Sequence, residues 1–421
     1  MTRPSVAVVG SGVAGLTAAY VLSKSAHVTL FEADNRLGGH ADTHYVDGPD
    51  GQVGVDTGFI VHNDRTYPTL LRLFAELDVP TQDSDMSMSI RCDGCGLEYS
   101  GGQGMRGIIP SLATLARPRY LSMLLEVKRF HREATTLLGS DPRDNDETLA
   151  AFLARSRFSE YFSSHFMAPL VSAVWSCNPE TALQYPARYL FTFLHHHGML
   201  SVTGSPVWRT VAGGSIEYVR RVAEHVDEIR TGTPVRAVYR RSDGVDIRDG
   251  ADVLRRFEKA VIAVHPQQAL KILAEPTGTE HQVLGAMPYS TNHTQLHTDE
   301  SVLPRTARAR ASWNYRMPTC GAKPDDVLVS YDLTRLQRLA DTRRFVVTLG
   351  GAHTVDPAAV LDEMTYEHPQ YTPQSLEAQR RLPELNTDTV AFAGAYHGWG
   401  FHEDGAKSGL DAAMRIGGRW A

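Results

Sequence analysis

The sequence predicts an α/β fold, because three separate stretches of the chain alternate short apolar runs with glycine-rich turns and helical segments. The first stretch opens the chain, where residues 6–9 (Val-Ala-Val-Val) lead into a glycine turn, a helix and a second apolar run at 27–32. The other two lie at 205–275 and 388–421. Runs this short and this apolar are typical of buried parallel strands.

The first glycine turn carries a dinucleotide fingerprint, Gly-Ser-Gly-Val-Ala-Gly. Gly10 ends the strand, Gly12 lets the backbone approach a pyrophosphate, and Gly15 allows the helix to pack on the strand. The phosphates would lie on the free N–H groups of the helix start, at Val13 and Ala14. The turn therefore predicts a Rossmann-type nucleotide-binding domain.

An acidic residue stands at the expected distance from this turn. Glu32 follows Gly12 by 20 residues and ends the second strand, where a carboxylate accepts hydrogen bonds from ribose hydroxyls. Its charge disfavours a 2'-phosphate. A second Gly-x-Gly-x-x-Gly at residues 102–107 follows a turn-rich region and lacks such an acid, so we expect a loop there.

Two further turns favour FAD over NAD. They are Arg36-Leu37-Gly38-Gly39-His40, which suits a second phosphate contact, and Val55-Asp56-Thr57-Gly58-Phe59, which brings backbone close to a flat ring system.

The C-terminal stretch supplies a site for the other end of FAD. The apolar run 390–395 enters a helix predicted at 405–417, and amides at a helix N-terminus stabilise the negative charge that a reduced flavin gathers at its N1–C2=O edge. The two ends of the chain would thus bracket one FAD, bound non-covalently. The predicted FAD contacts are Gly10, Gly12, Val13, Ala14, Gly15, Glu32, Ala33, Arg36, Gly38, Gly39, His40, Thr57, Gly58, Phe59, Val235, Gly394, His402, Glu403 and Ala406.

Taken in order, these motifs resemble the FAD-dependent amine oxidase and phytoene desaturase superfamily. Within it, segments such as Val174-Trp175-Ser176-Cys177 and Gly400-Phe401-His402-Glu403-Asp404-Gly405 resemble a subgroup fused to, or encoded beside, cyclopropane fatty-acyl phospholipid synthases. The resemblance implies a Rossmann-type FAD-binding domain with a discontinuous mixed α+β substrate domain. The expected FAD-binding pieces are 1–64, 205–275 and 388–421, and the expected substrate-binding pieces are 65–204 and 276–387.

Bulk properties favour a cytoplasmic enzyme. The 421 residues suffice for two packed domains, and the net charge of -6 argues against nucleic-acid binding. The four cysteines are too few and scattered for a disulfide framework. Cys92-x-x-Cys95 lacks the second ligand pair that a zinc site requires, so we expect no metal. Adjacent side chains diverge on a helix, so His195-His196-His197 predicts a polar turn rather than a metal site.

Two segments bear on a lipid substrate. Residues 105–132 carry six basic residues against one acid, with leucines interspersed, so this stretch either lies peripherally on an anionic membrane surface or forms a solvated helix face. The aromatic residues of 158–208 either fill a core or line an apolar tunnel. The resemblance favours the tunnel, because it implies a lipid acyl chain as substrate and a cyclopropane-synthase-like methyltransferase as partner.

The expected chemistry is hydride transfer from carbon to flavin N5. The candidate catalytic residues are His402 and Glu403, as a ring contact and proton relay, and Tyr67; the carboxylates at 403 and 404 would alternatively serve only the helix dipole. The first hypothesis is a dehydrogenase (desaturase) of unsaturated, cyclopropanated or methyl-branched fatty-acyl chains. The others are a flavin amine oxidase and a non-catalytic flavoprotein partner of a lipid methyltransferase.

Overall fold

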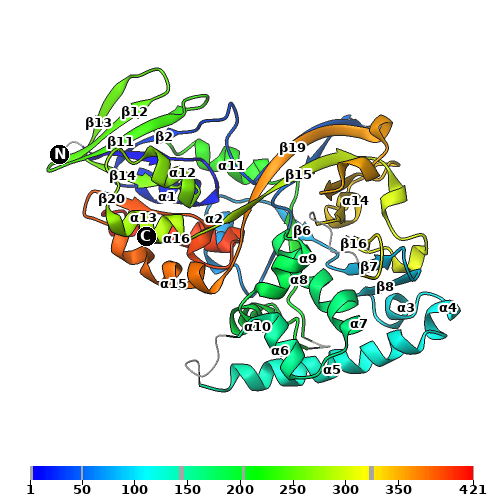
Figure 1. The fold of residues 1–421 in the computed structure, drawn as a ribbon. Helices are drawn as coiled ribbons and strands as arrows, with labels where there is room; N and C mark the ends of the chain where they lie inside the picture. The colour runs from blue at the N-terminus through cyan, green and yellow to red at the C-terminus, as the bar shows by residue number, and fades with distance from the viewer. Residues whose placement is uncertain (1–2, 49–50, 142–146, 202–203, 322–326, 421) are drawn as a thin grey trace.

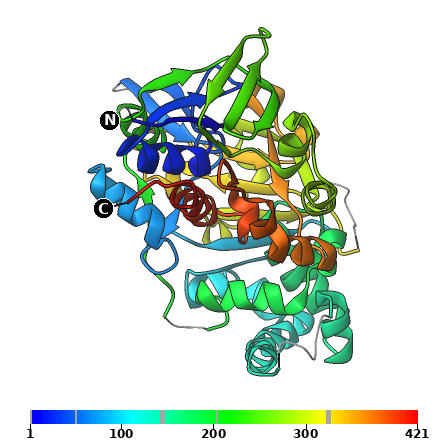
Figure 2. The ribbon, with the colours of Figure 1, turned by 90° about the vertical axis from the view of Figure 1, so that its left-hand side faces the viewer.

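The computed structural model describes residues 3–48, 51–141, 147–201, 204–321 and 327–420. The chain forms two layers of sheet with a helical lobe beneath the second (Figures 1 and 2). The polar turn expected at 139–146 falls largely outside the described residues.

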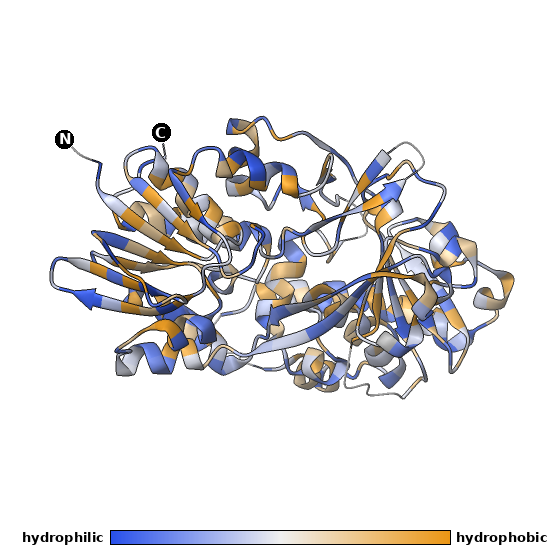
Figure 3. Ribbon diagram, turned by 90° about the horizontal axis from the view of Figure 1, so that it is seen from above, coloured by the Kyte–Doolittle hydropathy of each residue, from blue (hydrophilic) through white to orange (hydrophobic). Residues whose placement is uncertain are grey.

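The first layer is a five-stranded parallel sheet, as the sequence predicts. Its strands, in spatial order, are β10 (Glu228–Arg230), β2 (His27–Phe31), β1 (Ser5–Val9), β14 (Lys259–Ile262) and β20 (Val390–Phe392). Side chains alternate between the two faces of a strand, and both faces of β1 are apolar and buried. Hydrophobic colour accordingly runs along these strands in Figure 3.

Helices cover both faces of this sheet. One face packs against α1 (Val13–Ser23), α2 (Pro68–Glu76), α11 (Ile216–Ala223) and α16 (His402–Arg415). The other packs against α12 (Pro266–Ile272), α13 (Gly278–Gly285), α15 (Pro373–Arg381) and the hairpin sheet of β11 (Val235–Arg241), β12 (Gly244–Asp249) and β13 (Leu254–Phe257). Helices α2, α13 and α15 come from ranges that the sequence assigned to the substrate-binding domain, yet their apolar faces belong to the core of this layer.

The second layer is a seven-stranded mixed sheet. Its strands, in spatial order, are β19 (Val360–Pro369), β15 (Tyr289–His297), β18 (Val346–Leu349), β17 (Val329–Asp332), β16 (Trp313–Met317), β7 (Met88–Cys92) and β8 (Leu97–Gly101). The pairing of β16 with β7 is parallel and the other pairings are antiparallel. In Figure 1 the long strands β15 and β19 run from the first layer to the second.

The helical lobe is formed by residues 105–196. Its elements are α3 (Met105–Ile108), α4 (Leu112–Leu115), α5 (Pro118–Leu138), α6 (Leu149–Arg155), α7 (Glu160–Phe162), the π-helical turn η2 (Ser163–Met167), α8 (Ala168–Trp175), α9 (Pro179–Gln184) and α10 (Ala187–His196). Short strands join the layers, namely β3 (Thr43–Gly48) with β4 (Gly51–Asp56), and β5 (His62–Asn63) and β6 (Thr81–Asp83) with β9 (Trp208–Val211); α14 (Leu333–Leu336) follows β17.

Two local expectations were wrong. The second glycine fingerprint, at 102–107, does follow a strand, β8, and its last three residues lie in the four-residue helix α3 rather than in a loop; β8 pairs antiparallel and forms no β-α-β unit. His195 and His196 of the histidine triplet end α10 rather than forming a polar turn, and His197 is the C-cap of that helix. His197 is buried there, and its ring stacks on Phe193 with centroids 4.0 Å apart.

Candidate FAD and substrate site

The turn between β1 and α1 has the shape of a diphosphate cradle. A Cβ on Gly15 would stand 1.8 Å from the carbonyl oxygen of Gly10, so only glycine permits this packing. A Cβ on Gly12 would meet no atom within 4 Å, which leaves that side of the turn open. Helix α1 has no side-chain cap and no acidic residue in its first turn, so its N–H groups suit an anion.

Glu32 lies beside this turn, as predicted for a ribose contact. Its Oε2 accepts hydrogen bonds from the Ser11 N–H at 2.9 Å and the Ser11 hydroxyl at 2.5 Å. Ser11 is a site residue that the sequence analysis missed. Its backbone oxygen and its hydroxyl both accept from the Gly38 N–H, at 3.1 and 3.2 Å, so it ties the first glycine turn to the second. Its only sequence signal is its position between two fingerprint glycines.

The predicted contacts Ala33 and Val235 belong to the same end of the site. The N–H of Thr233 donates to the Glu32 carbonyl at 2.8 Å, and the N–H of Gly232 donates to Asp34 at 2.7 Å. The start of β11 is therefore held beside the segment that carries Glu32.

In the second glycine turn, residues 36–40, the positive charge expected to contact a phosphate is already paired. Arg36 forms an ion pair with Asp42 at 2.9 Å and donates to the Gly39 carbonyl at 3.0 Å, so its guanidinium already has an anionic partner. His40 has a buried Nε2 atom that forms no hydrogen bond with the described residues. Burial lowers the pKa of His40 to about 4, so its ring is neutral at physiological pH. A buried polar atom without a partner fits a residue that contacts a bound cofactor.

The turn at 57–59 packs directly against this histidine. The Phe59 N–H donates to the His40 carbonyl at 2.6 Å, and a Cβ on Gly58 would stand 2.3 Å from that same oxygen. The Thr57 hydroxyl bonds the Tyr366 hydroxyl at 2.6 Å, which joins the turn to β19. The predicted flavin turn thus lies where the two layers meet.

The start of α16 completes this region, as the sequence predicts, although the helix begins at 402 rather than 405. Gly405 and Gly409 let it lie against α1. Ala406 is fully buried between them, and the Gly394 N–H donates to the Ser408 hydroxyl at 2.9 Å. The N-termini of α1 and α16 therefore lie side by side, which suits a cofactor with a phosphate at one end and an electron-accepting ring at the other.

The predicted proton relay between His402 and Glu403 is not formed. His402 stacks on Phe59 with centroids 3.6 Å apart, and its Nε2 bonds the Tyr218 hydroxyl at 3.0 Å. Burial, with the neighbouring His40, keeps the pKa of His402 well below its usual value. A neutral ring in this stack acts as a flat contact surface rather than as an acid.

Glu403 turns away from His402 toward α2. Its two oxygens accept the N–H groups of Thr69 and Leu70, each at 2.9 Å. Burial raises the pKa of Tyr67, so its phenol stays protonated and cannot serve as a base. Glu403 therefore caps the start of α2, because its carboxylate accepts the free N–H groups there, and Tyr67 occupies the N-cap position without a side-chain hydrogen bond to the helix.

An aromatic wall stands over the turn that precedes α16. Phe193 lies 4.9 Å from Phe401 and 4.7 Å from Trp175 between ring centroids, and the Trp175 Nε1–H donates to the Trp399 carbonyl at 3.1 Å. The hydroxyl of Tyr189 donates to the carbonyl of Gly398 at 2.8 Å. The remaining predicted tunnel residues of the lobe fill its core or pack against it, namely Phe158, Tyr161, Phe162, Phe166, Tyr185 and Phe191.

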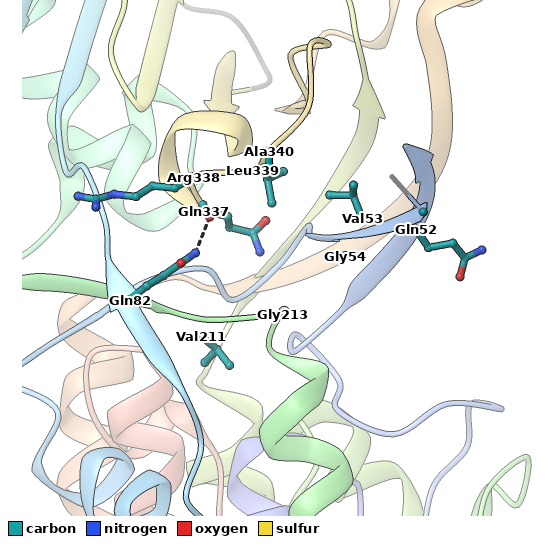
Figure 4. A pocket seen from close by; sticks show the side chains of 11 residues that line it. Gln52, Val53, Gly54, Gln82, Val211, Gly213, Gln337, Arg338, Leu339 and Ala340 are labelled. Atoms are coloured by element: carbon teal, nitrogen blue, oxygen red, sulfur yellow. Dashed lines mark hydrogen bonds between the residues drawn. The ribbon is translucent and has the colours of Figure 1, made fainter. Parts of the chain in front are cut away.

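A cavity of about 310 Å³ lies behind this region (Figure 4). It is bounded by β4, the end of β9 and the segment after α14, and Gln82 donates to the Gln337 carbonyl at its edge at 2.6 Å. None of the predicted site residues lines it. Gln337 bonds both the N–H and a carboxylate oxygen of Asp56, so this cavity is separated from the turn at 57–59 by a buried hydrogen-bond network.

The family model for flavin-containing amine oxidoreductases matches residues 13–417. The chain is 27% identical over 288 residues to a Mycobacterium tuberculosis protein named as a flavin-containing monoamine oxidase, AofH, with 64% of this chain and 59% of that protein covered. It is 28% identical over 232 residues to the coproporphyrinogen III oxidase of Mycobacterium bovis, with 51% and 49% covered. The chain thus spans between about half and three-fifths of these relatives.

Solved structures share the whole fold. Cyclohexylamine oxidase from Brevibacterium oxydans superposes with a TM-score of 0.70 at 18% identity over 98% of both chains. Putrescine oxidase superposes equally well, at 15% identity over 99% of both chains. The glycine cradle, the paired helix N-termini and the family match over nearly the whole chain lead to one conclusion: the chain belongs to the flavin-containing amine oxidoreductases.

Proposed function

We propose that this enzyme dehydrogenates an unsaturated, cyclopropanated or methyl-branched fatty-acyl chain that is presented by a membrane surface. The proposal rests on a face of the helical lobe, here called the lipid face, which exposes large apolar side chains. Leu112, Leu125 and Met105 are 85%, 70% and 66% exposed. These side chains lie on the consecutive helices α3, α4 and α5, and a group of exposed apolar side chains is typical of interaction sites.

Exposed basic residues lie in the same stretch of chain as the apolar side chains of the lipid face. Arg106, Arg119, Lys128 and Arg132 are exposed, and among the described residues they form no ion pair. Apolar side chains flanked by unpaired cations match the headgroup region of an anionic bilayer, where each basic residue contributes about 1 kcal/mol of attraction. No described helix combines the length and hydropathy that crossing a bilayer requires.

The aromatic wall suits an uncharged substrate segment. The two carboxylates at the start of α16 are occupied: Glu403 by the N–H groups of α2, and Asp404 by the Phe401 N–H at 2.9 Å. Phe193, Phe401 and Trp175 therefore offer an apolar surface next to the predicted flavin turn. Bound FAD supplies a hydride acceptor at N5, and these rings would exclude water and hold an acyl carbon against it.

Amine oxidation is the second candidate function. The family comparisons favour it, and closely spaced rings such as Phe193 and Phe401 can hold an ammonium group over an aromatic face. The third candidate is a flavoprotein that presents lipid to a cyclopropane-synthase-like methyltransferase without its own redox turnover. That candidate predicts co-purification with such an enzyme and no reduction of flavin by lipid.

A pair of variants tests the lipid face. Leu112→Asp/Leu125→Asp should abolish sedimentation with anionic phospholipid vesicles and slow flavin reduction by vesicle-borne lipid at least tenfold. The same double variant should keep wild-type reduction by short-chain lipid dissolved as monomers. The control is Leu254→Asp on β13, a leucine that is 51% exposed at the far end of the molecule (Figure 1). Equal vesicle turnover by the double variant and the control would contradict membrane presentation.

A further inference from the structure

Four metal-ligating side chains meet at one point of the second layer. Cys92 ends β7, Cys95 lies in the turn to β8, His165 lies in η2 and Cys320 follows β16. One ligand atom from each side chain lies within 4.8 Å of all the others. This group is separate from the FAD site and plays no part in the chemistry described above.

The spacing of these atoms is that of a tetrahedral site. The sulfurs of Cys92 and Cys320 are 3.7 Å apart, and the Cys95 sulfur is 3.7 Å from Nε2 of His165. Zinc bonds of about 2.3 Å to sulfur and 2.0 Å to nitrogen place tetrahedral ligand atoms about 3.8 Å apart for two sulfurs and about 3.5 Å for sulfur and nitrogen. Both observed distances match these edges.

The turn that carries Cys92 and Cys95 has a conformation that supports metal ligands. The Gly96 N–H donates to the Cys92 carbonyl at 2.8 Å, and Gly96 has a φ of +67°. A Cβ on Gly94 would stand 2.8 Å from the Cys320 nitrogen, so glycine lets the segment with Cys320 come close.

The imidazole of His165 is oriented for a ligand role. Its Nδ1 bonds the Ser164 hydroxyl at 2.8 Å, which leaves Nε2 facing the sulfurs. The ring stacks on Tyr161 at 3.9 Å, and the Tyr99 hydroxyl donates to the His165 carbonyl at 2.8 Å. Such outer contacts commonly fix a histidine in a metal site.

We propose that Cys92, Cys95, His165 and Cys320 bind one structural zinc ion. Four protein ligands fill a tetrahedral coordination shell and leave no open position, which distinguishes a structural site from a catalytic one. Binding displaces three thiol protons to solvent, so the site becomes a Zn²⁺ ion held by three thiolates and one neutral imidazole.

The zinc ion would clamp the mixed sheet to the helical lobe. Two ligands come from the β7–β8 turn, one from the end of β16 and one from η2, and β7 packs against η2. Arg117, at the start of α5, donates to the Cys95 carbonyl at 2.6 Å and to the Gly96 carbonyl at 3.1 Å, so the longest helix of the lobe is fixed to the same turn. The sequence analysis expected no metal because Cys92-x-x-Cys95 lacks a second pair; the fold brings that pair from 70 and 228 residues away.

Elemental analysis of the full-length protein tests the site. Protein purified under reducing, chelator-washed conditions should contain about one zinc per chain, and Cys95→Ser and Cys320→Ser should each lose most of it. The control is Cys177→Ser, a buried cysteine outside the cluster, which should keep its zinc. Zinc content is independent of FAD loading and of lipid turnover.

A cobalt titration keeps the proposal testable if a variant fails to fold. Wild-type protein stripped of metal and then given Co²⁺ should develop the intense visible absorption of tetrahedral cobalt thiolate, with release of protons. Zinc below one-tenth per chain together with no cobalt spectrum would overturn the proposal. So would a thiol titration that finds only two of the four cysteines free, because a Cys92–Cys320 disulfide would then explain the cluster.

Discussion

Gly409 of α16 lies against the carbonyl oxygen of Ala14 in α1, so closely that a Cβ on Gly409 would stand 2.1 Å from that oxygen. Gly405, one turn earlier, would place a Cβ 2.5 Å from Cγ1 of Val13. This contact joins the first and last helices of the nucleotide-binding layer. It also brings the phosphate-binding end of α1 beside the helix start that faces the flavin turn.

Replacing Gly409 with alanine should therefore damage both stability and cofactor binding. Backbone atoms cannot yield to the added methyl group, so the helices must separate, at a cost of about 1–3 kcal/mol of unfolding free energy. Thermal denaturation and the FAD content of purified Gly409→Ala measure the two effects. Gly285→Ala is the control, because a Cβ there meets nothing within 4 Å. Wild-type FAD content in Gly409→Ala would show that the contact does not shape the site.

Ser11 should contribute to FAD affinity, although the fingerprint assigns roles only to the glycines on either side of it. Its hydroxyl connects Glu32 to the Gly38 N–H, and Ser11→Ala removes that link. The loss of a buried hydrogen bond of about 1 kcal/mol predicts a Kd for FAD about five- to tenfold higher. Fluorescence titration of the apoprotein with FAD provides the measurement. Ser23→Ala, at the opposite end of α1, should bind FAD like wild type; equal Kd values for both variants would remove Ser11 from the site.

Glu403→Gln separates a positioning role from a proton relay. The amide keeps one acceptor for the N–H groups of Thr69 and Leu70 and loses the other, so we expect a loss of about 1–2 kcal/mol of stability. The rate of flavin reduction at saturating substrate should stay within about twofold of wild type, with an unchanged pH profile. The exposed Glu377→Gln serves as the control for stability. A rate loss of a hundredfold together with a missing limb of the pH profile would restore the relay.

The contribution of Asp404 to stability should fall as the pH rises from about 4 to about 7, opposite in sign to that of buried histidines such as His40. Burial raises the pKa of Asp404 to about 7, so the folded state holds a proton there that the unfolded chain releases near its ordinary value of 3.8. Between these two values the folded state binds more protons, and deprotonation then favours unfolding. Asp404→Asn removes this contribution while it keeps an acceptor for the Phe401 N–H, so the Tm of the variant should gain on that of wild type as the pH rises from about 4 to about 7. An unchanged slope of Tm against pH in Asp404→Asn would assign the effect to other groups.

The nucleotide-binding layer could be predicted because the residues that specify it lie close together in the sequence. Each strand of the first β-α-β unit is a short apolar run, and the glycines and Glu32 stand at spacings fixed by strand and helix geometry. The C-terminal half of the site was predictable for the same reason, since β20 and α16 follow each other directly. Alternation of apolar and polar residues also predicts strands at 312–315, 326–331 and 345–349, and the structure forms β16, β17 and β18 there, although residue 326 falls outside the described residues.

The features that the sequence analysis missed or assigned wrongly depend on contacts between distant parts of the chain. β7 pairs in parallel with β16, where Ser89 donates to Asn314 across 225 residues, and no local pattern encodes that register. This pairing brings Cys320 to Cys92. The place of Glu403 at the start of α16 suggested a partner in its own helix. Its carboxylate instead accepts an N–H group 334 residues away. Side-chain roles that depend on such contacts require the fold.

Anaerobic absorbance of the FAD-loaded protein tests the central claim most directly. We expect the visible band of oxidised flavin to bleach when vesicles carrying unsaturated, cyclopropanated or methyl-branched acyl chains are added, and to persist with saturated vesicles and with amines. Bleaching by an amine, with no response to any lipid, would contradict the lipid assignment and make the protein an amine oxidase.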